Sequence, residues 1–123
     1  MRETHVWWSS DGKLGSAGGT RPVGGREGGA SVYGVHDMAG NVWEWCADRA
    51  NDLSPAPYDT SQVVDPTGPS MGSYRVIRGG SWDSLDAQNL RSSDRYALPP
   101  GARGNYLGFR LARGQESVLQ PGR

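Results

Sequence analysis

The sequence predicts a small, loop-rich α+β domain with short antiparallel strands. Its 123 residues are enough to bury one hydrophobic core but not two. Its 19 glycines and 8 prolines bring the composition close to that of disordered chains. Its 5 tryptophans and 5 tyrosines, in contrast, supply large aromatic surfaces that need burial. Short segments that alternate apolar and polar residues are typical of half-buried strands. We therefore predict one domain over residues 1–113 and a frayed tail over residues 114–123.

The first third of the chain is expected to be irregular. Residues 12–29 are rich in glycine and form a predicted loop, within which residues 20–24 are expected to be extended. Pro22 disfavours helical geometry at the residue before it, and Val23 offers an apolar anchor to the core. Residues 33–40 predict a tight turn or a short helical turn that ends at Gly40.

The next segment predicts the first strand. Residues 42–45 alternate, with Trp43 and Trp45 on one face. Residues 51–73 are rich in Asp, Ser, Pro and Gly and predict a long loop, with a turn at residues 65–69.

Three further strands are expected in the second half. Residues 75–77 predict a strand that Gly79 and Gly80 interrupt. Residues 90–95 predict a short strand, and residues 107–111 predict a half-buried final strand because Leu and Phe alternate there with Gly and Arg.

The charge balance excludes several classes of partner. Thirteen basic and thirteen acidic residues cancel, so no net field favours nucleic acid or an anionic membrane. We see no signal peptide and no membrane-spanning stretch, so a cytoplasmic location is the default expectation. The single cysteine, Cys46, excludes an internal disulfide framework.

Three blocks carry the most information: residues 40–45 (Gly-Asn-Val-Trp-Glu-Trp), residues 78–82 (Arg-Gly-Gly-Ser-Trp) and residues 108–110 (Gly-Phe-Arg). Together and in this order they resemble the formylglycine-generating enzyme, or sulfatase-modifying factor, family. The chain is also similar to the variable proteins of diversity-generating retroelements. The resemblance implies a C-type-lectin-like fold.

The resemblance also implies that part of the usual domain is absent. Domains of the family are longer and have an additional N-terminal part, so we expect an N-terminally reduced fold, a fragment, or a core that another chain completes. Trp7 and Trp8 are candidates for such a contact in a homo-oligomer, because a large aromatic patch seldom stays exposed in a monomer. The alternative is that both are ordinary core residues.

Active enzymes of the family bind copper through two cysteine thiolates that follow the Gly-Ser-Trp block. The matching positions of this chain hold Ser84 and Asn89. Because Cu(I) selects thiolate, neither a hydroxyl nor a carboxamide replaces these ligands. We therefore expect no copper and no catalytic residues, and we interpret Cys46 as a buried apolar thiol. The competing hypothesis is a formylglycine-generating oxidase that another chain completes, and an inactive family fragment is a third.

The resemblance further implies a structural calcium site. Its ligands would be the carboxylates of Asp37 and Glu44 with the carbonyls of Gly40 and Val42, an oxygen-only set that suits calcium. Alternatively, Asp37 caps the turn, Asn41 satisfies backbone groups, and Glu44 pairs with an arginine.

The arginines within and near the matched blocks are expected to be structural. Guanidinium groups suit bidentate pairing with Asp48, Asp94 or Glu44, and the alternative is an anion-binding face. The arginines in question are Arg75, Arg78, Arg91, Arg95 and Arg110.

The remaining candidate is a binding face between the blocks, over residues 83–106. Tyr, Asn, Asp and Ser on an ordered scaffold are typical of adaptable protein-binding faces. The alternative is a solvated loop surface without a partner, so the identity of a protein or other ligand stays open. The predicted ligand-binding residues are Asp83, Ser84, Asp86, Gln88, Asn89, Asp94, Tyr96, Asn105 and Tyr106.

Overall fold

The computed structural model describes residues 5–9, 18–55 and 68–113. Within these ranges the regular elements are the 3-10 turn η1 (Glu27–Gly29), strands β1 (Trp43–Ala50) and β2 (Tyr74–Arg78), the 3-10 turn η2 (Ala87–Leu90), and strands β3 (Tyr96–Leu98) and β4 (Leu107–Gly108). None of the described residues forms an α-helix. No helix in the described part of the chain is long and apolar enough to cross a membrane.

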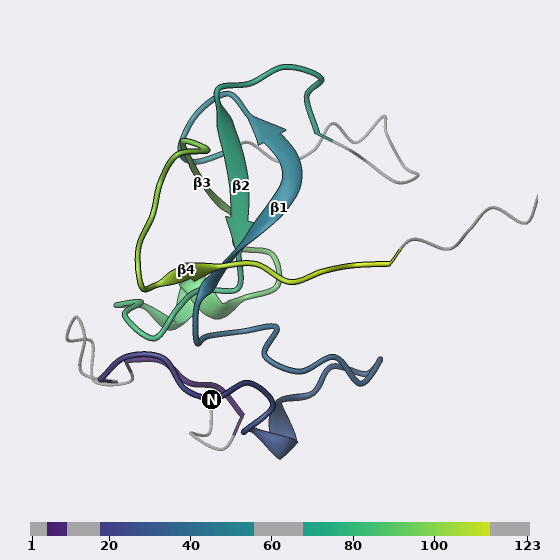
Figure 1. Cartoon of the computed structure of the whole chain (residues 1–123), viewed down its shortest axis with the longest axis vertical. Coiled ribbons are helices and arrows are strands. Elements are labelled where there is room, and N and C mark those ends of the chain that lie inside the picture. The colour runs from purple at the N-terminus through teal and green to yellow at the C-terminus, as the bar shows by residue number, and fades with distance from the viewer. Residues whose placement is uncertain (1–4, 10–17, 56–67, 114–123) are drawn as a thin grey trace, which may run out of the picture.

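The four strands form one curled sheet in the order β3-β2-β1-β4 (Figure 1). β1 pairs antiparallel with β2, β2 pairs antiparallel with β3, and β4 runs parallel to the start of β1. The register of β1 against β2 shifts between Trp45 and Arg49, which marks a bulge in β1. The segments before β1 lie beyond one end of the sheet rather than within it (Figure 1).

The core is small and lies on β1, β2 and β3. Ala50, Val76 and Ala97 are buried together, and Cys46 and Tyr74 pack against them. The core cluster therefore consists of small and medium side chains from three neighbouring strands.

Two residues with positive φ, Gly40 and Asn41, lie just before β1. Gly40 has φ 78° and Asn41 has φ 64°, both in the left-handed region that glycine and asparagine tolerate best. Gly40 also pairs with Trp7 in an isolated parallel bridge, and a Cβ at position 40 would lie 2.4 Å from the Trp7 carbonyl oxygen. Glycine is therefore required where the N-terminal segment meets the sheet.

Three local predictions were wrong. The strand expected over residues 90–95 is absent: Leu90 ends the turn η2, and residues 91–95 form an irregular turn before β3. The Asp86 carboxylate accepts a hydrogen bond from the Gln88 N–H at 2.8 Å and caps η2, which favours a helical turn over a strand here. The final strand ends at Gly108, and Phe109 is 73% exposed. Val23 is exposed instead of anchoring its loop to the core.

Other predictions have different outcomes. The strand expected over residues 75–77 is confirmed within β2, and the one expected over residues 42–45 is confirmed from Trp43 onward, since β1 begins there. β4 pairs in parallel rather than antiparallel. Residues 33–40 turn without forming a helical turn. Most of the turn predicted at residues 65–69 and the whole predicted tail lie outside the described residues.

Candidate functional site

The predicted binding face comes from η2, β3 and the loops beside them. Its members differ in exposure: Asp86, Gln88, Tyr96 and Asn105 are exposed, Asp83, Asn89, Asp94 and Tyr106 are half-buried, and Ser84 is buried.

Hydrogen bonds hold this face in place. The Asn89 amide donates to the Asp94 carboxylate at 3.3 Å, and the Gln88 amide donates to Asp86 at 3.3 Å. The Trp82 indole N–H donates to the Asn105 carbonyl at 3.2 Å and fixes the loop before β4. The exposed polar groups are thus carried on an ordered backbone, as a binding face requires.

One aromatic neighbour was not predicted. The Trp43 ring lies 6.5 Å from the Tyr96 ring, centroid to centroid, with the two planes at 42°. Such tilted pairs stabilise and orient both rings. The alternation in residues 42–45 indicated that Trp43 lies on a strand, but it carried no information on the residue of β3 that Trp43 contacts.

Ser84 and Asn89 both serve the fold. Ser84 is only 7% exposed, and its hydroxyl oxygen accepts the Ser81 N–H at 3.0 Å. The buried Ser81 hydroxyl donates in turn to the Asp83 carboxylate. Because Ser84 is buried, it does not share the accessibility of Asp86 or Gln88. Neither Ser84 nor Asn89 supplies the thiolate that copper needs, so these residues do not fit a copper centre.

Cys46 lies on β1 against the core. Burial raises the pKa of the Cys46 thiol; Arg78 opposes this shift, and the carboxylates of Asp48 and Glu44 add to it. A raised pKa keeps the sulfur protonated near neutral pH, when it is a poor nucleophile and a poor metal ligand.

A second cluster lies at the start of β1. Asp37, Gly40, Val42 and Glu44, the four predicted calcium ligands, all line one open cavity of about 390 Å³. Arg110 lines the same cavity. The four predicted ligands therefore share one cavity.

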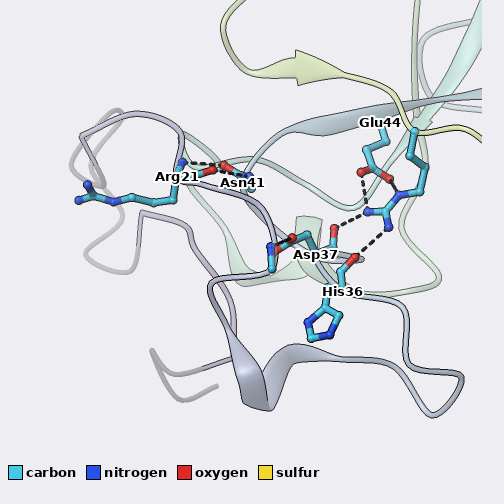
Figure 2. A network of polar contacts seen from close by, with 7 residues as sticks. Arg21, His36, Asp37, Asn41 and Glu44 are labelled. Carbon is cyan, nitrogen blue, oxygen red and sulfur yellow. Dashed lines mark hydrogen bonds and ion pairs between the residues drawn. The ribbon is translucent and has the colours of Figure 1, made fainter.

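The two carboxylates of this set already have partners (Figure 2). Arg110 donates from Nε to one oxygen of Glu44 at 2.7 Å and from Nη2 to the other at 2.6 Å, a bidentate ion pair. Its two Nη groups also donate to the carbonyls of His36 and Asp37, each at 2.8 Å. These contacts raise the pKa of Arg110, chiefly through the hydrogen bond to Glu44.

Asp37 and Asn41 complete the cluster. The Asp37 carboxylate accepts the Gly24 N–H at 2.6 Å. The Asn41 side chain accepts the Arg21 N–H at 3.0 Å and donates to the Arg21 carbonyl at 3.2 Å. Glu44 thus pairs with an arginine, and Asn41 satisfies backbone groups, as the alternative interpretation expected.

These contacts bear on the predicted ion. A calcium ion between Asp37 and Glu44 would have to displace the Arg110 guanidinium, so this arrangement is not a ready cation site. Across the described ranges, no three His, Cys, Asp or Glu side chains gather to hold a metal. The predicted site uses only two carboxylates with carbonyls, and it stays a prediction.

Two other arginines of this group donate hydrogen bonds to main-chain carbonyls. Arg78 donates to the carbonyls of Ser92 at 2.5 Å and of Asp94 at 3.2 Å, and Arg95 donates to that of Pro55 at 3.1 Å. These bonds tie loops to the sheet. The predicted bidentate pairing with a carboxylate is confirmed for Arg110 and Glu44.

Comparison with known proteins decides the family. The profile of the family described as "Sulfatase-modifying factor enzyme 1-like domain" matches residues 3–115. The chain belongs to this family. Among solved structures, it is similar to Treponema denticola variable protein 1, with a TM-score of 0.65 and 33% identity over 87% of this chain and 35% of that one. It is also similar to PvdO from Pseudomonas aeruginosa, with a TM-score of 0.62 and 31% identity over 86% of this chain and 38% of that one.

Curated relatives carry several different names. A Formylglycine-generating enzyme from Streptomyces coelicolor is 39% identical over 90% of this chain and 33% of its own length. A Serine/threonine-protein kinase pkn1 from Chlamydia caviae is 45% identical over 69% of this chain and 13% of its own length. A Hercynine oxygenase from Mycolicibacterium smegmatis is 39% identical over 74% of this chain and 22% of its own length. The chain spans a third or less of each of these relatives.

Proposed function

We propose that this chain is a non-catalytic binding domain of the sulfatase-modifying factor family with a C-type-lectin-like fold. Its binding face is made by exposed residues of η2, β3 and the loop before β4. One observation carries the proposal: Ser84 and Asn89, where the family resemblance implies copper-binding cysteines, are hydrogen-bonded parts of the scaffold. The similarity to a variable protein supports a display role for this part of the fold.

The ligand class follows from the face. Tyr96 and Asn105 offer an aromatic surface and an amide, and Asp86 and Gln88 add exposed polar groups. Such a mixture suits a protein or peptide surface better than a deep small-molecule pocket.

Peptide selection tests the face. A random peptide library displayed on phage is panned on the parent protein, and the selected peptides are measured by calorimetry against Tyr96→Ala and Tyr106→Ala. We expect each variant to stay folded and to lose at least about tenfold in affinity, because tyrosine is a frequent anchor of binding faces. Tyr33→Ala is the matched control, since Tyr33 is 89% exposed and lies outside the face. Unchanged binding by folded Tyr96→Ala and Tyr106→Ala would reject this face.

The alternative is an oxidase that another chain completes, and the similarity to formylglycine-generating and hercynine-oxidising relatives favours it. Titration with Cu(I) in the presence of a reductant tests the non-catalytic proposal for this chain. We expect no tight binding, because one half-buried thiol does not form a two-thiolate site. Stoichiometric tight binding would overturn the non-catalytic proposal.

Calcium at Asp37 and Glu44 and association of copies through Trp7 and Trp8 are further proposals. Trp7 and Trp8 are both half-buried, so neither residue is enclosed in the core. Sedimentation should show a dimer or larger species, and a monomer at all concentrations tested would refute the association.

A further inference from the structure

A pocket beside Trp7 places two positive charges over one aromatic ring. The guanidinium carbon of Arg21 lies 4.2 Å from the centre of the Trp7 ring, and that of Arg26 lies 5.2 Å from it. Both arginines and Trp7 line a single cavity of about 220 Å³. The negative face of an indole attracts guanidinium groups, so the Trp7 ring stabilises both arginine side chains in these positions.

The backbone of each arginine is fixed. Arg21 is bonded through its own N–H and carbonyl to the side chain of Asn41, which is 8% exposed. The Arg26 carbonyl accepts the Gly29 N–H at 2.9 Å at the start of η1. Figure 2 shows the Arg21 side chain extending away from Asn41, so its charged end is free of the bonds that hold its backbone. A ligand that met these guanidinium groups would order little additional chain.

The local charge is positive although the chain as a whole is neutral. In the described part of the chain, neither Arg21 nor Arg26 forms an ion pair with a carboxylate. Asp37 also lines the pocket and accepts the Gly24 N–H, so the lining carries two positive charges against one negative charge. Trp7 is itself fixed, since its indole N–H donates to the Gly19 carbonyl at 2.6 Å.

We propose that this pocket binds an oxyanion, a carboxylate or phosphate group, between the guanidinium groups of Arg21 and Arg26. Planar guanidinium groups bind such oxyanions through paired, charge-assisted hydrogen bonds. The cavity is smaller than those that take drug-sized ligands, and it suits one charged group. The site is separate from the binding face of η2 and β3, and it stands whether or not that proposed function holds.

The indole N–H of Trp7 reports on the pocket in two-dimensional ¹H–¹⁵N NMR spectra of the full chain, with its signal assigned from Trp7→Phe. Inorganic phosphate and glutarate are titrated separately, and sodium chloride at matched ionic strength is the control. We expect phosphate, glutarate or both to shift the Trp7 signal saturably. The affinities measured in the phosphate and glutarate titrations show whether the pocket prefers a phosphate or a carboxylate group. Equal shifts with chloride, or none with either anion, would overturn the proposal.

Substitutions then locate the anion. Arg21→Gln and Arg26→Gln should each weaken binding by about tenfold or more, since each removes charged hydrogen bonds. Arg21→Gln keeps the backbone groups that pair with Asn41, so folding is preserved. Arg103→Gln removes an exposed charge elsewhere and should leave the affinity unchanged. If Arg103→Gln weakens binding as much as Arg21→Gln, the effect is one of net charge, and the site is refuted.

Discussion

Arg110 should be the most sensitive exposed residue of this domain. It makes a bidentate pair with Glu44 and donates to two main-chain carbonyls in the segment before β1. The side chains of Arg110 and Glu44 are 34% and 23% exposed. An exposed ion pair contributes about 0.2–1 kcal/mol, whereas breaking a buried pair costs about 3–5 kcal/mol.

The expected cost of Arg110→Met lies between these limits. The variant leaves a partly buried carboxylate and two carbonyls without their donors, so we expect a loss of about 2–3 kcal/mol in the free energy of unfolding. Arg110→Lys keeps the charge but not the fork of donors, and we expect a loss of about 1–2 kcal/mol. For a domain of this size, Arg110→Met should lower Tm by roughly 8–15 °C.

Urea unfolding followed by tryptophan fluorescence measures these losses, with Arg103→Met as an exposed control that should stay within about 0.5 kcal/mol of the parent. A double-mutant cycle of Arg110→Met with Glu44→Gln isolates the pair, and we expect a coupling energy of about 1–2 kcal/mol. Additive losses, or an Arg110→Lys variant as stable as the parent, would show that the bidentate geometry contributes nothing.

Three other predictions concern the same region of the sheet. The raised pKa of Cys46 means that the native state holds the thiol proton more tightly than the unfolded chain. The free energy of unfolding should therefore fall as pH rises above the thiol's ordinary pKa, and it should fall less in Cys46→Ala. Iodoacetamide should label Cys46 at pH 8 far more slowly in the native protein than in the unfolded chain. Equally fast labelling of the two states would contradict this prediction. Gly40→Ala should lower the free energy of unfolding by about 2–4 kcal/mol, because its Cβ meets the Trp7 carbonyl at a left-handed φ; a neutral effect in urea unfolding would disprove the close approach. If calcium displaces Arg110 from Glu44, chelation with EGTA should lower Tm in the parent but not in Glu44→Gln; an unchanged Tm in the parent counts against the ion.

Sequence alone predicted the elements whose signals are local. Trp43 and Trp45 alternate with polar neighbours, so the first strand could be recognised, but its extension to Ala50 could not. Residues 46–50 combine small and charged side chains without alternation, and they are extended because β2 pairs with them from more than twenty positions away. β3 was missed because it has only three residues and follows a capped helical turn.

For the candidate sites too, the sequence indicated the local contacts but not the long-range ones. The motif in residues 37–44 indicated which side chains share a cavity, since a turn brings neighbours in sequence together. It did not indicate that Arg110 would form the ion pair with Glu44, because five arginines within or near the matched blocks could have paired with this carboxylate. The cation pair over Trp7 was not foreseen either. It depends on how a glycine-rich loop returns across the N-terminal segment, and no local pattern encodes that path.

Asn41 acts on its neighbour as if it were an extra peptide unit, since its carboxamide presents one donor and one acceptor to the main chain at position 21. This pair of hydrogen bonds involves no side chain of the loop. The side chains of residues 20–23 could therefore be changed to alter specificity while the contact with Asn41 is kept, provided that position 21 is not proline, which has no N–H to donate.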